Sequence, residues 1–306
     1  MDRIRAITRG QAGQATPEYV GLVLLLAATL GAVLAVIGPA VPGGALARAL
    51  AGKLICAVDP SGSCGGEAAA LEPSPSPLEA AYGGDLGAML AERAPTLWFE
   101  QDDFASLPVD YRECRQRSCA DSISHGSLQH TQTGLQPTIF THVVDCRDPE
   151  SAAADGYDCS GERAGNVYLQ YWLYYPDSAT HGFGSQGYHL DDWEAYQVKV
   201  DPQTGEASAR ASSHHGYNGR DGDSWNDTGF SAGKPGWDSV LGQLHVAAGS
   251  HAGMTEKSDD DDRWLSPSNQ RLVPLEPIAA AGGTPSFEIT PPWEKDVWSD
   301  PEATGT

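Results

Sequence analysis

Side chains able to do chemistry are concentrated in His189-Leu-Asp-Asp-Trp-Glu194, where a polar turn leads into an apolar run. Side chains alternate along a strand, so an extended segment over 191–200 would place two carboxylates on the face that becomes apolar. That face carries Asp192, Glu194, Tyr196, Val198 and Val200, and the other carries Asp191, Trp193, Ala195, Gln197 and Lys199. Burying an unpaired carboxylate is costly, so the pair requires a cation, an arginine or a shared proton.

A divalent cation is the simplest partner for this pair. Asp and Glu oxygens suit Ca²⁺ or Mg²⁺, with Mn²⁺ a third choice, and His189 could add an imidazole from the turn before the strand. The non-functional alternative is a solvated turn, because carboxylates at the start of a strand often face water. The spacing His-x-x-Asp-x-Glu is also not specific by itself.

The run from Val167 to Val200 resembles the signature of the NLP (necrosis- and ethylene-inducing-peptide-like) proteins. In that family a strand reading Tyr-x-Trp-Tyr-x-Pro precedes an Asp, a glycine-rich loop and the heptapeptide Gly-His-Arg-His-Asp-Trp-Glu. The matching residues here are Trp172, Tyr174, Tyr175, Pro176, Asp177, His189, Asp192, Trp193 and Glu194. The resemblance implies a β-sandwich on which Asp177, His189, Asp192 and Glu194 surround a divalent cation that meets membrane sphingolipid headgroups. Tyr188 stands where the motif has Gly, and Asp191 stands where it has its second His.

Further segments resemble the vacuolar-protein-sorting sixty-two group, whose bacterial members carry Ala-Pro-x-Leu-x-Phe and later Gly-Ser-His-Ala. The matching segments are Ala94–Phe99, Leu107–Asp110, Val246–Ala252 and Leu272–Glu276, and Ser213–Tyr217 resembles a small element that follows the NLP heptapeptide. Two histidines in these segments, His251 and His214, are candidates to hydrogen-bond to the metal-ligating side chains without contacting the cation. A satisfied structural histidine is the equal alternative for His251.

Composition favours one large, mostly β domain. The chain of 306 residues contains 35 Gly and 21 Pro, and short aromatic or β-branched runs occur at 167–175, 195–200 and 243–248. These features predict a β-sandwich or jelly roll over residues 81–306, preceded by a short helix at 78–93 that Gly83 and Gly84 weaken. The net charge of −22 excludes nucleic acid as an electrostatically attracted partner.

The N-terminus predicts a single membrane-spanning helix. Arginines at 3, 5 and 9 precede an uncharged run from Val20 to Val41, which is long enough to cross a bilayer with the N-terminus inside. The text around Glu18 resembles the class III leader of Flp-type pilins and TadE-like pseudopilins. This resemblance implies cleavage after Gly13, a mature end at Gln14, and pilin subunits as partners. An ordinary secretory signal or plain anchor is the alternative.

The predicted organisation is therefore a leader at 1–13, a pilin-like helix at 14–56, a linker at 57–80 and the β domain. Six cysteines fall into three close pairs, which predicts disulfides rather than zinc knuckles and agrees with export. The pairs are Cys56 with Cys64, Cys114 with Cys119, and Cys146 with Cys159. The expected location is the cell membrane with an extracellular C-terminal domain, or a secreted or pilus-associated form.

The sequence thus favours a cell-surface binding protein with a divalent-cation site and a lipid headgroup or glycan as ligand. Two other classes stay open. A metal-dependent hydrolase or cytolysin-like secreted effector would use the same cluster, with His251 or His214 as base. A structural minor pilin would need no ligand.

Overall fold

The computed structural model describes residues 75–100, 106–119, 134, 136–178, 188–213, 216–218, 236–259, 261–276 and 286–304. The chain divides into two compact units, Met1–Pro75 and Ser76–Thr306, and the description below concerns the second. The predicted leader with Gly13, Gln14 and Glu18, the membrane helix, and Cys56 and Cys64 lie outside the described residues. Within the described ranges, no helix is long and apolar enough to cross a membrane.

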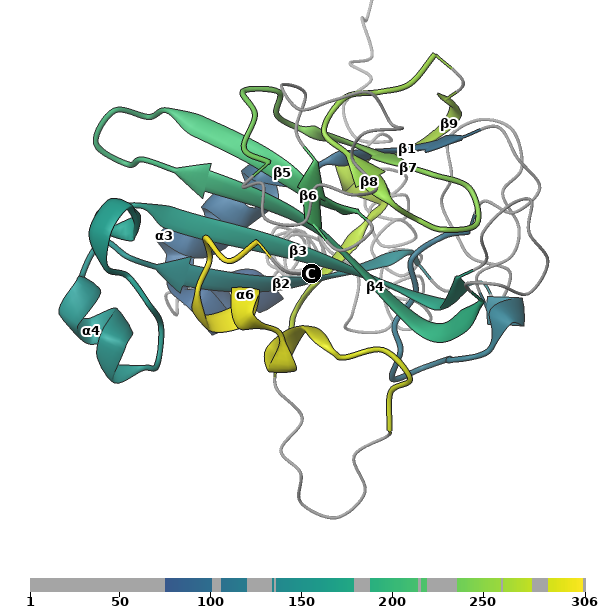
Figure 1. Ribbon diagram of the computed structural model, residues 1–306, viewed down its shortest axis with the longest axis horizontal. Coiled ribbons are helices and arrows are strands. Elements are labelled where there is room, and N and C mark those ends of the chain that lie inside the picture. The colour runs from purple at the N-terminus through teal and green to yellow at the C-terminus, as the bar shows by residue number, and fades with distance from the viewer. Residues whose placement is uncertain are drawn as a thin grey trace, which may run out of the picture. The chain divides into compact units, whose positions relative to one another are not determined.

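The described domain is mostly β, as predicted, and contains two mixed sheets (Figure 1). One sheet has the order β8-β7-β1-β9 and the other β10-β2-β3-β4-β5-β6, and each includes one parallel pair, β1 with β7 and β10 with β2. The strands are β1 (Thr96–Glu100), β2 (Thr138–Asp145), β3 (Val167–Ser178), β4 (His189–Val200), β5 (Ala207–Ser213), β6 (Gly216–Asn218), β7 (Gln243–Val246), β8 (Gly253–Met254), β9 (Asp261–Leu265) and β10 (Arg271–Pro274). The helices are α3 (Pro77–Arg93), α4 (Pro149–Ala154) and α6 (Asp296–Ser299), with 3-10 turns at Arg117–Cys119, Gly161–Arg163, Pro267–Asn269 and Pro292–Glu294.

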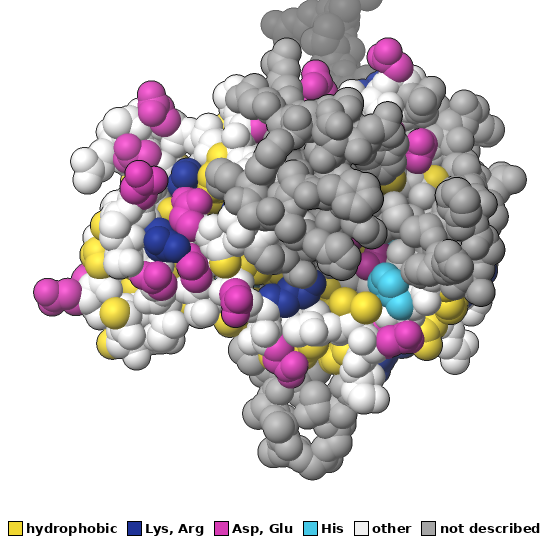
Figure 2. Space-filling view, viewed as in Figure 1, with side chains coloured by type: hydrophobic (Ala, Val, Ile, Leu, Met, Phe, Trp, Pro, Cys, Tyr) yellow, Lys and Arg dark blue, Asp and Glu magenta, His cyan; other side chains and the backbone are white. Residues whose placement is uncertain are grey.

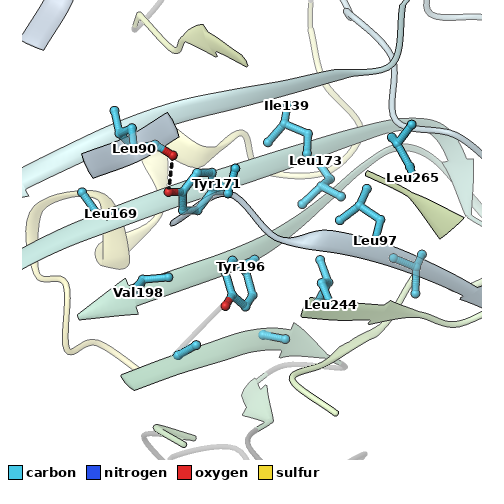
Figure 3. Packing of buried hydrophobic residues seen from close by; sticks show 14 of the residues in the cluster. Leu90, Leu97, Ile139, Leu169, Tyr171, Leu173, Tyr196, Val198, Leu244 and Leu265 are labelled. Carbon is cyan, nitrogen blue, oxygen red and sulfur yellow. Dashed lines mark hydrogen bonds between the residues drawn. The ribbon is translucent and has the colours of Figure 1, made fainter. Parts of the chain in front are cut away.

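Side chains from both sheets and from α3 meet in one core, part of which Figure 3 shows. Leu169, Tyr171 and Leu173 of β3 are fully buried there, and the Tyr171 hydroxyl donates to the Leu90 carbonyl at 2.8 Å. The alternation predicted for β4 is confirmed, since its inward face contributes Tyr196, Val198 and Val200 to this core. The core therefore fixes the two strands that carry the candidate site.

The opposite face of the six-stranded sheet is covered by a second, aromatic cluster. Trp193 and Ala195 of β4 lie in it, again as the alternation predicts. The C-terminal segment crosses this face, and Figure 1 shows α6 beside β2 and β3. Trp298 stacks on His142 with ring centroids 3.5 Å apart, and Gln170 donates to the Val297 carbonyl at 2.8 Å.

Two of the three predicted disulfides lie within the described residues, and both are formed. Cys114 joins Cys119 and Cys146 joins Cys159, with Cα–Cα distances of 6.1 and 5.2 Å. Disulfides persist in oxidising compartments, so they favour an extracellular or secreted domain.

Helix α3 confirms the helix predicted at 78–93 but begins inside the range assigned to the linker. Ser76 caps it, because its side chain accepts from Glu79 N while the Glu79 carboxylate accepts from Ser76 N. Gly83 has φ +80°, so the helix is two arms joined at a corner. Gly87 then packs on the first turn, where a Cβ would stand 2.7 Å from Glu79 N.

The corner gives a matched pair of glycine substitutions. We expect Gly87→Ala to lower the free energy of unfolding by about 2 kcal/mol, because backbone atoms of the first turn must move to admit the methyl group. Gly84→Ala meets nothing within 4 Å. It should leave stability unchanged or raise it by up to about 1 kcal/mol through helix propensity. Urea unfolding of both variants measures the difference, and equal effects would show that the arms do not pack this way.

Candidate functional site

The register of β3 and β4 brings the predicted acids to one end of the sheet. Tyr175 pairs with Asp192, Leu173 with Glu194, and Asp177 with Leu190. Asp177, Asp192 and Glu194 therefore occupy the same face of neighbouring strands. Asp177 is 7% exposed and Asp192 6%, while Glu194 is half-buried. The sequence correctly places these acids where the core of the sheet begins.

Asp192 is held by a histidine from the loop after β7. Its Oδ2 lies 2.8 Å from His251 Nδ1, and its Oδ1 lies 3.9 Å from His189 Nε2. The His251 imidazole stacks on the Tyr175 ring with centroids 3.8 Å apart and an interplanar angle of 3°. His251 has φ +55°, in the left-handed region that few residues other than glycine adopt. His251 thus contacts a predicted ligand, whereas His214 lies outside the described residues.

Glu194 lies among protein groups although part of its side chain reaches the surface. Burial and the neighbouring charge of Asp192 raise its pKa well above the usual value, against a hydrogen bond from the Ser212 hydroxyl and the positive charge of Lys295. Burial lowers the pKa of Lys295, and the negative charges of Glu194 and Asp192 oppose that shift. The two carboxylates therefore repel each other, and no sequence pattern predicted that Lys295 would lie near them.

Asp177, the remaining predicted acid, contacts an arginine. Arg117 Nε lies 3.7 Å from Asp177 Oδ2, and 56% of the arginine side chain is exposed. Burial raises the pKa of Tyr188, and the charge of Asp177 together with its hydrogen bond to the tyrosine hydroxyl adds to the shift. Tyr188 is 48% and Leu190 45% exposed, so two large side chains flank His189 at the surface.

Asp191, which departs from the NLP motif, points to the other face, and its buried carboxylate pairs with the partly exposed Arg115. It accepts from Arg115 at 2.5 to 2.9 Å, from the Tyr174 hydroxyl at 2.7 Å and from Glu288 N at 3.0 Å. Burial opposes ionisation, but the hydrogen bonds from Arg115 and Tyr174 prevail and lower its pKa. Its φ of +61° turns the chain between His189 and Asp192.

Asp192 lies beside His189 and Glu194, and the three predicted acids already have protein partners. Across the described ranges, no group of three or more His, Cys, Asp or Glu side chains stands ready to hold a metal ion. Asp177 contacts Arg117, Asp192 contacts His251, and Glu194 accepts from Ser212. The three carboxylates supply the oxygen donors that Mg²⁺, Ca²⁺ and Mn²⁺ prefer, whereas the imidazole of His189 is a less usual ligand for Ca²⁺ and Mg²⁺. Binding would require these protein partners to give way, and the cation site stays a prediction.

Three of the ring side chains near the acids carry buried polar atoms without a hydrogen-bond partner among the described residues. These atoms are His251 Nε2, the Tyr175 hydroxyl and Trp193 Nε1. Neither their burial nor the Asp192–His251 bond is readable from spacing, because His251 follows Asp192 by 59 residues.

Comparisons with known proteins give a limited result. No protein-family model matches the chain, and no curated protein matches it. Among solved structures, a crystal structure of an NLPPya mutant matches at 17% identity with TM-score 0.32, covering 62% of this chain and 75% of that one. A structure described as a toxin fold for microbial attack and plant defense matches at 16% identity with TM-score 0.32, covering 62% and 76%. NLPPya in complex with glucosamine matches at 18% identity with TM-score 0.31, over 62% and 76%.

Proposed function

We propose that this domain is an exported binding domain whose site, Asp177, His189, Asp192 and Glu194, takes up a divalent cation and through it a ligand at the cell surface. Ca²⁺ or Mg²⁺ is the expected ion, with Mn²⁺ third. One observation carries the proposal: Asp192 and Glu194 occupy consecutive inward positions of β4, and Asp177 projects from the same face of β3. The protein partners of these carboxylates include one arginine contact at 3.7 Å and no other ion pair with Arg or Lys among the described residues, so a cation could still offset their charge.

Electrostatics supports uptake of a cation here. Like charges that share a site repel strongly in a medium of low dielectric constant, and a divalent ion is the partner that relieves several carboxylates at once. His251 would keep Asp192 oriented through its Nδ1 contact, as supporting residues commonly do for metal ligands. When bound, the cation would offer free coordination positions to oxygen atoms of a ligand.

The placement of the site at a cell surface rests on the N-terminal segment and on the acidic surface. The proposed membrane helix, whether cleaved after Gly13 or not, would hold the domain outside the cytoplasm. Asp and Glu side chains are spread over the face seen in Figure 2, in keeping with 41 Asp and Glu against 19 Lys and Arg. A lipid headgroup or a glycan that carries anionic or hydroxyl oxygens is the proposed ligand, because the cation would bridge it to an acidic protein.

The test is calorimetric titration of Ca²⁺, Mg²⁺ and Mn²⁺ into the full-length protein. We expect the double variant Asp192→Asn with Glu194→Gln to lose cation binding, because it removes two of three carboxylate ligands. In the wild type, cation at 100 times its Kd should also raise the free energy of unfolding by about 2.7 kcal/mol.

The matched control removes the same charge elsewhere. Asp155→Asn with Glu206→Gln changes two exposed acids outside the site and should bind the cation like the wild type. A wild-type protein that binds no divalent ion, or a site variant that binds as well as the control, would refute the proposal.

A further inference from the structure

A cavity of about 540 Å³ opens between α3 and α4, beside the end of β2. Figure 1 shows α4 at the end of the sheet where β2 stops and β3 starts. The cavity is apart from the candidate site, because Asp145 pairs with Val167 at the start of β3, whereas Asp192 pairs with Tyr175 near its end. Its volume suits a small molecule, since such sites measure roughly 300–1,000 Å³. Substitutions in one site therefore leave the acids of the other in place.

One wall of the cavity is a loop closed by a disulfide. The bond between Cys146 and Cys159 encloses α4 and the lining residues from Arg147 to Tyr157. Tyr157 is held at its far end, since its hydroxyl lies 3.1 Å from Nε2 of the buried His142. This wall is therefore supported by protein contacts of its own.

The opposite wall is the corner of α3. Tyr82 and Leu86 line the cavity there, and the Tyr82 hydroxyl donates to the Thr141 carbonyl of β2 at 2.5 Å. Gly87 packs on the first turn of the same helix and so keeps the corner closed. With both walls supported, a ligand that enters the cavity orders few side chains, and such preorganisation favours affinity.

Part of the lining is apolar. Val143 and Ala152 are buried, and Ala81 and Leu86 add further aliphatic surface. Burial of a hydrocarbon stem against these side chains would remove apolar surface from water, which is favourable. The cavity therefore suits a ligand with an apolar part.

The charged part of the lining carries an excess of negative charge. Arg147 is its one cationic residue, and that guanidinium is already paired with Asp145 at 2.7 Å and with Asp85 at 2.6 Å. Asp148 and Asp155 also line the cavity, and within the described ranges neither forms an ion pair with Arg or Lys. A ligand of complementary charge would be a cation.

We propose that this cavity binds an organic cation, whose ammonium group lies beside Asp148 and Asp155 while its hydrocarbon stem contacts the apolar part of the lining. Tyr82 and Tyr157 add ring faces that attract a cation. Burial raises the pKa of Tyr157, and the nearby charge of Asp155 adds to the shift, so this carboxylate and the ring lie close together. The proposal does not depend on the divalent-cation site.

The experiment titrates three ligands with the same stem, hexylamine, hexanol and hexanoate, into the full-length protein at pH 7. Hexylamine is protonated there, as a lysine side chain is. We expect it to bind at least about tenfold more tightly than hexanol, the ratio for one charged interaction, and hexanoate to bind most weakly. The double variant Asp148→Asn with Asp155→Asn should lose this preference, so that hexylamine binds no better than hexanol. Asn at 148 can still cap α4.

Glu92→Gln with Asp259→Asn is the matched control, because it removes the same charge from two exposed acids that do not line the cavity. It should bind hexylamine like the wild type. Ala81→Phe places a ring in the cavity and should weaken all three ligands. Equal binding of hexylamine and hexanol by the wild type overturns the proposal. So does hexylamine binding that survives in the double variant or in Ala81→Phe.

A further arm separates two sources of an alkylammonium group, a free amine and a lysine side chain of a partner protein. The probe is lysine with its amino and carboxyl groups blocked as acetyl and methylamide. Binding within about tenfold of hexylamine supports a lysine side chain, because the peptide groups are then tolerated at the mouth of the cavity. Weaker binding of the blocked lysine supports a free amine. Failure of both ligands to bind overturns the proposal.

Discussion

Replacing Arg210 by Met should lower the free energy of unfolding by about 4 kcal/mol, because it removes a fully buried guanidinium and strands the acceptors around it. Arg210 Nε donates to Gln197 Oε1 at 2.9 Å, and Nη2 donates to the carbonyls of Pro301 and Ala303 at 2.7 and 3.1 Å. The guanidinium also lies over the rings of Tyr217 and Trp237, with its carbon 3.7 and 4.4 Å from their centroids. Met fills much of the space but satisfies none of these acceptors.

We expect the C-terminal segment to lose its structure first, because Arg210 donates to the carbonyls of Pro301 and Ala303 in that segment. The same end of the segment has two ion pairs nearer the surface, where Glu302 accepts from Lys199 at 3.0 Å and Arg163 pairs with Asp300 at 2.6 Å, while Val297 and Trp298 are anchored separately on Gln170 and His142. Limited proteolysis should therefore cut residues 295–306 faster in Arg210→Met, before global unfolding.

Arg147→Met provides the comparison for the stability measurement. The Arg147 side chain is 39% exposed and its guanidinium pairs with Asp145 and Asp85, so its removal should cost less than about 1 kcal/mol. Urea unfolding of both variants measures the two losses in free energy of unfolding. Similar losses in the two would mean that the buried contacts of Arg210 contribute no more than a surface ion pair.

Arg210 also shows the limit of what the sequence could predict. Alternation along 191–200 correctly assigned Tyr196, Val198 and Val200 to one face and Trp193 and Ala195 to the other, because the two faces of the strand pack in different hydrophobic clusters. The aromatic run at 167–175 marked β3 for the same reason, although the strand continues to Ser178 and so includes Asp177. The local sequence pattern predicts these faces, because the polarity of each strand residue indicates which side of the sheet it occupies.

Pairings between distant segments were not readable. Alternation and register place the acids of the site on one face of β3 and β4, but Arg117, Lys295 and Ser212 approach them from three other segments. The spacing of residues along the sequence does not predict such contacts, because tertiary packing alone decides which segments cover the sheet. The two arginines of this region lie between cysteines five residues apart, so the predicted disulfide groups them in one short loop but does not place that loop beside β3 and β4.

The stability of a domain that buries polar side chains should also depend on pH. We expect the largest effect from His142. The imidazole is buried, with Nδ1 3.1 Å from Gln170 Oε1 and Nε2 3.1 Å from the Tyr157 hydroxyl, and Trp298 stacks on it. Burial lowers its pKa to about 4, although the bond with Gln170 opposes the shift.

Because the folded pKa lies below the unfolded value of about 6.5, the unfolded chain takes up the proton first. The stability that neutral His142 contributes is complete above pH 6.5 and is lost as the pH falls towards 4. The loss amounts to about 3 kcal/mol, at about 1.4 kcal/mol for each unit of pKa difference. Urea unfolding at a series of pH values, with a chelator present, measures it.

His142→Gln should flatten this part of the pH profile, because no proton is taken up at that position in either state. It will also lower stability at pH 7, where the imidazole packs against Trp298, so the slope rather than the absolute value is the readout. His189→Gln changes a half-buried histidine and leaves His142 in place, so it should keep the wild-type slope. A slope that persists in His142→Gln would mean that groups other than His142 set the acid sensitivity of this fold.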